Sequence, residues 1–149
     1  METLKVLHIL GVVIWVGGMF FAYMVLRPVV NQLLPSPPQM LKFWQTVFAS
    51  FFHWVWLSIT VILASGLHMI AQMGGFKALP FNVYLMFAIG SMMILIFLYV
   101  YFTAYRKLKR YVAAEEWESA GIALVQIRVL VGLNLILGFV TIAIAILDA

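Results

Sequence analysis

The chain has 149 residues, of which 66% are hydrophobic and 9% are charged, and its formal net charge is +4. Because apolar residues far outnumber those that a small soluble domain can bury, this composition excludes an ordinary water-soluble protein. A mean hydropathy of +1.11 instead predicts an integral membrane protein. A helical span needs about 20 residues, so residues 1–149 are expected to form one transmembrane domain with four spans. The absence of cysteine excludes disulfides and thiolate metal sites, and leaves chemistry to His, Met, Tyr and carboxylates.

The first predicted span covers about residues 4–26 and contains one histidine, within the segment KVLHILGVVIWVGGMFFA. At ~100° per residue, an imidazole, an indole and three small residues share one narrow stripe of this helix. The stripe consists of His8, Gly11, Trp15, Gly18 and Ala22. It predicts room for a flat ligand beside the imidazole. The alternative is that the small residues only let a neighbouring helix pack closely.

The second predicted span follows a proline-rich loop. Pro28, together with the prolines of residues 35–38, is expected to end the first helix, because proline lacks a backbone donor and restricts its predecessor. The second span then covers about residues 41–72 and carries two further histidines, His53 and His68. Ionisable groups inside a membrane span are costly, so both are candidates for function.

The third and fourth predicted spans contain fewer polar groups. The third covers about residues 81–105 and has no ionisable side chain other than tyrosine. Residues 106–119 are of mixed charge and predict a loop or a short surface helix. The fourth span covers about residues 121–147, with Arg128 where its continuous apolar stretch begins. The four spans and their short connections predict an all-α, antiparallel four-helix bundle.

The basic residues are distributed unevenly between the two ends of these spans. One side has only Lys5 and Lys77, whereas the first and third loops hold Arg27, Lys42, Arg106, Lys107, Lys109, Arg110 and Arg128. The positive-inside rule therefore predicts that these loops are cytoplasmic and that both termini lie on the outer side of a bacterial inner membrane. Basic residues beside spans are topology signals, so nucleic acid is not expected as a partner.

The three histidines fall at two predicted depths. His8 and His68 each lie a few residues from the outer end of their span, and so share a level. His53 precedes His68 by 15 residues. This spacing corresponds to about 22 Å of depth and about 60° of rotation. Histidines on facing helices are the axial ligands of membrane b-type haems, which makes His8 and His68 the natural pair. His53 would need another partner, a second subunit or a five-coordinate iron.

Each of these polar residues also has a purely structural interpretation. An intramembrane histidine can hydrogen-bond a neighbouring hydroxyl or carbonyl group without binding any ligand. Asn134, Gly138 and Thr141 form a small polar stripe on the fourth span, which either supports a cofactor or holds helices together. Arg128 could pair with a haem carboxylate, or it could only mark the cytoplasmic interface.

The first span also resembles a known family. The segment LKVLHILGVVIWVGGMFF is similar to the first helix of the CopD-like four-helix membrane proteins, with His8, Trp15, Gly17 and Gly18 at matching positions. Similarity continues at SGLHM in the second span and, in the last span, at Arg128, Asn134 and Gly138. The haem-bearing branch of this family implies that His8 is an axial ligand. The distantly related HemJ-type oxidases carry a lysine in the third helix, which residues 81–105 lack, and this difference argues against porphyrinogen oxidation.

Two functions are therefore predicted. The preferred one is a b-type haem protein, a haem-dependent oxidoreductase or electron carrier, acting on a quinol, superoxide, peroxide or nitrogen oxide near the outer membrane face. The alternative is copper binding or transport through His8, His68, Met69 and Met73, because thioether and imidazole groups are suitable Cu(I) ligands. A helper subunit without a cofactor is a third possibility. The unmatched His53 also predicts a homodimer.

Overall fold

The computed structural model describes residues 2–147, and all regular structure in that range is helical. The elements, in chain order, are α1 (Glu2–Phe20), η1 (Phe21–Leu26), α2 (Arg27–Leu33), α3 (Pro37–Gln72), η2 (Phe76–Ala78), α4 (Phe81–Tyr99), η3 (Val100–Ala104), α5 (Tyr105–Ala113) and α6 (Trp117–Leu147). Elements η1 and η3 are π-helical, and η2 is a short 3-10 helix.

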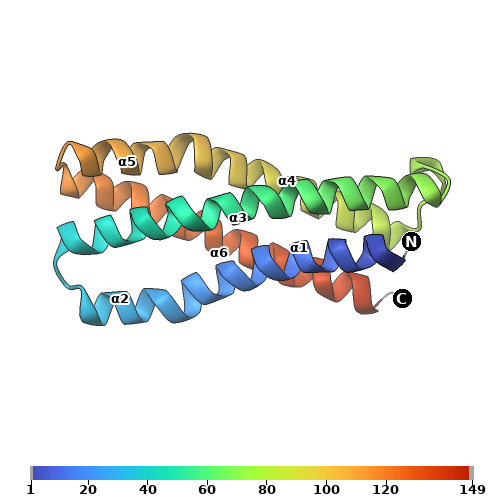
Figure 1. Ribbon diagram of the computed structural model, residues 1–149, viewed down its shortest axis with the longest axis horizontal. Coiled ribbons are helices and arrows are strands. Elements are labelled where there is room, and N and C mark those ends of the chain that lie inside the picture. Colours follow the sequence, from blue (N-terminus) through green and yellow to red (C-terminus); the bar gives the residue numbers. More distant parts are fainter. Residues whose placement is uncertain (1, 148–149) are drawn as a thin grey trace.

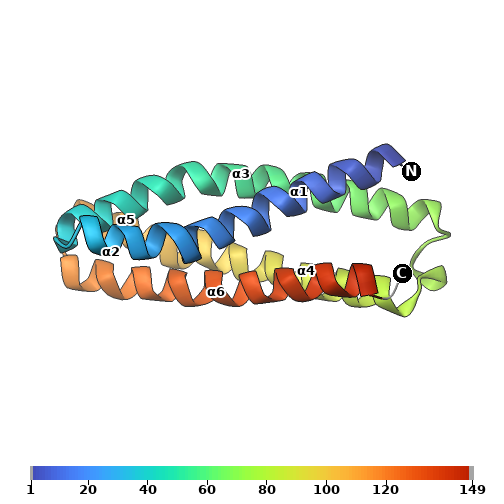
Figure 2. The same ribbon diagram turned by 90° about the horizontal axis from the view of Figure 1, so that it is seen from below.

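These elements join into four long rods, each apolar and long enough to cross a membrane. The rods are Glu2–Leu33, Pro37–Gln72, Phe81–Ala113 and Trp117–Leu147. They lie side by side, with the N- and C-terminal ends of the chain at the same end of the bundle (Figures 1 and 2). The prediction of an all-α protein with four membrane-spanning helices is confirmed, and the protein is an integral membrane protein.

The first rod is longer than its predicted span, and the expectation that Pro28 ends it is wrong. The chain continues through Pro28, in the first turn of α2, as far as Leu33. Just before the proline, η1 widens the helix, and the Arg27 N–H donates to the Ala22 carbonyl in the π-helical pattern. Pro28 has no backbone N–H to donate, but it lies in the first turn of α2, directly after the π-helical segment. The helix therefore continues through Pro28 with a locally changed hydrogen-bond pattern.

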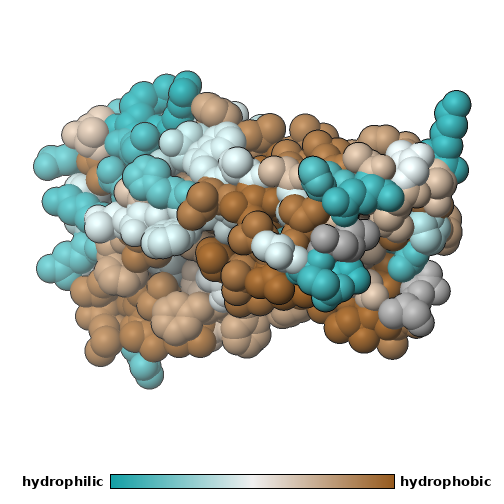
Figure 3. All heavy atoms as spheres, turned by 45° about the vertical axis from the view of Figure 1, so that its right-hand side comes forward, coloured by the Kyte–Doolittle hydropathy of each residue, from teal (hydrophilic) through white to brown (hydrophobic). Residues whose placement is uncertain are grey.

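The core of the bundle is aromatic, and its surface is apolar. Phe52 stacks on Phe48 with 5.1 Å between ring centroids and meets Phe97 edge-on at 5.4 Å, so α3 and α4 interlock through their rings. Outward-facing residues such as Leu95 and Ile136 are 66% and 60% exposed, as expected of side chains that face lipid. Figure 3 shows one face, on which hydrophobic residues predominate over the middle and hydrophilic residues gather most densely at the end that holds α5.

Candidate functional site

The face of α1 that carries the glycines packs directly against α3. A Cβ atom on Gly11 would lie 2.8 Å from Cγ1 of Ile62 and 3.3 Å from the Ser58 carbonyl oxygen. A Cβ atom on Gly18 would collide with the ring of Phe51. The space that these glycines leave is therefore filled by α3. The residues present between α1 and α3 do not fit a haem, because no flat group can enter where the two helices are in contact.

His8 lies at this same interface, one turn beyond Gly11 toward the termini. Its Nδ1 atom is 3.0 Å from Oγ of Ser65 on α3. The Ser65 hydroxyl itself donates to the Val61 carbonyl, at 2.6 Å. A hydroxyl has one proton, and with that proton directed to the Val61 carbonyl, Ser65 accepts the bond from His8. In this arrangement the imidazole carries its proton on Nδ1, and the lone pair on Nε2 is free to bind a metal ion.

The other two histidines lie elsewhere on α3. His53 and His68 are both exposed on the surface of the bundle, whereas His8 is half-buried. Within residues 2–147 no three side chains of His, Cys, Asp or Glu come close enough together to hold a metal ion.

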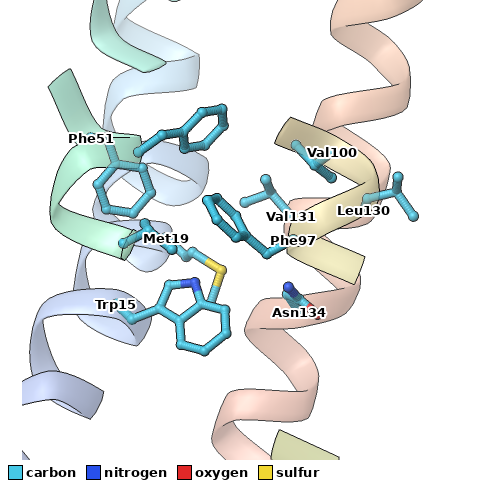
Figure 4. Close-up of a pocket in the computed structure, with 10 residues that line it drawn as sticks. Trp15, Met19, Phe51, Phe97, Val100, Leu130, Val131 and Asn134 are labelled. Carbon is cyan, nitrogen blue, oxygen red and sulfur yellow. The ribbon is translucent and has the colours of Figure 1, made fainter. Parts of the chain in front are cut away.

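Asn134 is the most deeply buried amide near the centre of the bundle. It is 3% exposed, and its Nδ2 atom donates to the Met93 carbonyl on α4 at 3.1 Å. Its Oδ1 atom has no hydrogen-bond partner among the described residues. Figure 4 shows Asn134 across a small cavity from Trp15, with Phe97 above them. Asn134 therefore joins α6 to α4, while Trp15 fills the space between α1 and these helices.

The remaining predicted site residues take structural positions. A Cβ atom on Gly138 would lie 2.8 Å from Cγ2 of Val16, so this glycine lets α6 approach α1. Thr141 donates to the Leu137 carbonyl of its own helix at 2.8 Å. Arg128 is exposed and lines a cavity together with Arg27, at the end of the bundle opposite the termini. None of the three histidines lines that cavity.

Comparison with known families identifies the chain. A family model described as copper resistance protein D matches residues 45–147, more than half of the sequence. The chain belongs to the copper resistance protein D family. The match includes His53, His68 and Asn134, and it begins after the helix that carries His8. No curated protein and no solved structure matches the chain.

Membership of the copper resistance protein D family confirms the predicted resemblance and identifies a membrane protein related to copper resistance. It favours the copper alternative over the haem redox function, which neither the structure nor the comparisons support. Ser65 is the first residue of the SGLHM motif, and the sequence did not predict its contact with His8. An antiparallel register for the first two helices would have found it, because that register pairs His8 with a residue near the start of this motif.

Proposed function

We propose that this copper resistance D family member binds Cu(I) at the end of the α1–α3 interface that holds the termini, as part of copper binding or transport across a bacterial inner membrane. The observation that carries the proposal is the bond from His8 Nδ1 to Ser65. Metal-binding histidines commonly donate their second ring nitrogen to an acceptor in this way, which fixes the tautomer and the orientation of the ring.

The register between the helices supplies a second ligand. Gly11 opposes Ile62, and His8 opposes both Ser65 and Gly66, so each step outward on α1 is matched by a step outward on α3. Met69 is one turn beyond Ser65, about 6 Å along the axis and about 40° around it. Met69 therefore follows the line of α3 residues that faces α1, and its side chain is half-buried. Its thioether sulfur is a soft ligand suited to Cu(I).

Met73 and His68 are the other two residues of the predicted copper set. Met73 is about one further turn outward, directly after the last residue of α3, and is exposed, as expected of a ligand that receives copper at the membrane surface. His68 lies about 100° around α3 from the line that contacts α1. We therefore assign His8 and Met69 as the inner ligands and Met73 as the outer one. His68 faces away from α1, on the exposed surface of α3.

The proposal is tested with the purified protein in mild detergent. Cu(I) is titrated in competition with a chromogenic Cu(I) chelator, and the visible spectrum is recorded before and after reduction. The expected result is a colourless protein that withdraws about one Cu(I) ion per chain from the chelator, because the proposed ligands, one imidazole and two thioethers, make up a single site. Failure to compete with a weak chelator, in a protein that is folded by circular dichroism, would overturn the proposal.

We also propose that the chain forms a homodimer through the exposed face of α3. At ~100° per residue, five polar side chains of this helix fall within about 80° of one another. They are Thr46, Ser50, His53, Thr60 and His68, and all are exposed. Intramembrane polar groups normally face protein rather than lipid. A two-fold axis along the membrane normal would place each histidine level with the same histidine of a second copy, where neutral imidazoles can both donate and accept.

The dimer is tested by cross-linking, for which the absence of cysteine is an advantage. Thr60→Cys places one thiol on the polar face of α3 and should give a covalent dimer with a short bis-maleimide in native membranes. Ile136→Cys is the matched control, because Ile136 is 60% exposed on the apolar face of α6. Equal cross-linking of the two variants, or cross-linking of the control alone, would rule out this interface.

A second candidate function depends on the same face of α3. If two copies pair there, His53 and His68 would each meet a symmetry-related imidazole, and two such histidines can hold a haem. A haem bound there would supply redox chemistry for a quinol or a small oxidant. The spectrum described above separates this candidate from copper binding, since a bis-histidine haem gives a Soret band and sharp reduced bands.

A further inference from the structure

A second cavity lies at the arginine-rich end of the bundle, away from the proposed copper ligands. Its volume is about 300 Å³. Three rods form it, and its lining residues are Ala22, Tyr23, Arg27, Asn31, Met40, Trp44, Phe48, Gly121, Leu124, Val125, Ile127, Arg128 and Val131. The lining is apolar except for two arginines, one asparagine and one tyrosine, and it contains no acidic residue. Nothing in the copper function requires this cavity.

The two arginines of the cavity lie at the same level on facing helices. A Cβ atom on Gly132 of α6 would lie 3.0 Å from Cε2 of Tyr23 in η1, which fixes the register between these antiparallel rods. Arg27 is four residues from Tyr23 on the first rod, and Arg128 is four residues from Gly132 on the last rod, both toward the arginine-rich end. The backbone positions of Arg27 and Arg128 therefore lie at a similar depth, and both side chains line the cavity.

The side chain of Arg27 packs against another residue of the cavity lining, Tyr23. Its Cζ atom lies 4.5 Å from the centroid of the Tyr23 ring, a cation–π contact that orients the guanidinium. Tyr23 belongs to η1, the π-helical segment that widens the first rod just before Pro28. Local π-helical segments are frequent at functional sites. Here the segment supplies both the ring that supports Arg27 and part of the cavity wall.

We propose that this cavity binds an anionic phospholipid, with its phosphate between Arg27 and Arg128. Arginine binds phosphate in a bidentate manner, and two guanidiniums that line one cavity with no acidic residue in its lining are most stable when they share an anion. Asn31 adds an amide donor on the same wall, and Met40 and Trp44 offer apolar surface to the glycerol and acyl portions. Basic pockets between helices on the cytoplasmic side of a membrane recognise lipid head groups in this way.

The test is native mass spectrometry of the full chain released from detergent, with phosphatidylglycerol, phosphatidylcholine or inorganic phosphate added. Phosphatidylglycerol should bind at least tenfold more tightly than phosphatidylcholine. Arg27→Gln and Arg128→Gln should each weaken its binding about fivefold to tenfold, because each removes a charge-assisted phosphate contact. Arg110→Gln removes the same charge from α5 at the same end of the bundle, outside the cavity lining, and should leave binding unchanged.

A steric variant separates this site from general surface charge. Nothing lies within 4 Å of a Cβ atom built on Gly121, so Gly121→Leu adds bulk to the cavity lining with no clash at Cβ and with both arginines intact. It should weaken phosphatidylglycerol binding about tenfold. Gly90→Leu is the matched control, because Gly90 on α4 has equally open space but does not line the cavity.

Four results would overturn the proposal. One is equal binding of the two lipids, and another is an equal loss of binding in Arg110→Gln and Arg128→Gln. The third is unchanged phosphatidylglycerol binding in Gly121→Leu. Competition by inorganic phosphate at equal concentration would show that the site recognises a free anion, which also contradicts a phospholipid site. None of these results depends on copper binding.

Discussion

Replacement of His8 by alanine is expected to lower the affinity for Cu(I) by about 100-fold or more, because it removes the only half-buried imidazole of the proposed site. Ser65→Ala keeps the imidazole but removes the acceptor that fixes its tautomer, at 3.0 Å from Nδ1. Ser65→Ala is expected to lower the Cu(I) affinity less, by about tenfold, as for other groups that orient a metal ligand. Both affinities are measured by competition with the chromogenic chelator.

The controls for His8 come from the same chain. His53→Ala removes an imidazole that is exposed on α3, about 18 Å along the axis from Ser65. It should leave Cu(I) affinity within about twofold of the unmodified protein. Met69→Leu keeps the volume of the side chain but removes the sulfur, and should lower the Cu(I) affinity about tenfold. An unchanged affinity in His8→Ala, or a larger loss in His53→Ala, would show that copper binds elsewhere.

Replacement of Asn134 by aspartate is expected to destabilise the bundle by about 3 kcal/mol or more. Asn134 is 3% exposed, and its amide donates to the Met93 carbonyl. An aspartate cannot make that bond when ionised, and the residues around the adjacent cavity include no cation. A buried carboxylate without a partner is among the most destabilising single changes. Thermal unfolding in detergent should show the loss, which should increase with pH as the carboxyl group ionises.

The matched control for Asn134→Asp is Asn134→Leu. Leucine removes the bond to Met93, but it also removes the Oδ1 atom that has no partner among the described residues. The small cavity beside Asn134, of about 10 Å³, gives the branched side chain some room. The stability of Asn134→Leu should stay within about 1 kcal/mol of the unmodified protein. Equal destabilisation by leucine and aspartate would contradict the hydrogen-bond explanation and indicate a purely steric constraint.

The sequence predicted the fold well because the relevant signal is local. Four long apolar segments must form helices in a bilayer, since no other open structure satisfies the backbone there. The first rod shows the limit of that reasoning. Pro28 was expected to end a helix that in fact reaches Leu33. The π-helical turn that accommodates the proline arises from packing and bonding within the bundle, and residue preferences alone do not reveal it.

The candidate site was only partly predictable from the sequence. The sequence distinguishes His8 because an imidazole inside an apolar helix is costly wherever the helix packs. Its surroundings were not predictable in the same way. Gly11 and Gly18 indicated a stripe of small residues, and a stripe alone does not tell whether a ligand or a neighbouring helix fills it. The structure fills it with Ile62 and Phe51 from α3.

The amino-acid sequence by itself determined that this protein resides in a membrane, that it has four helices, and that His8 is the exceptional residue of the first. The tertiary structure decided what His8 touches. Its contact with Ser65 joins residues 57 positions apart, and it depends on the register and rotation of two antiparallel helices. Periodicity gives the face of a helix but not the partner of that face. Only the packing of α1 on α3 left Nε2 as the free nitrogen and placed Met69 beyond it.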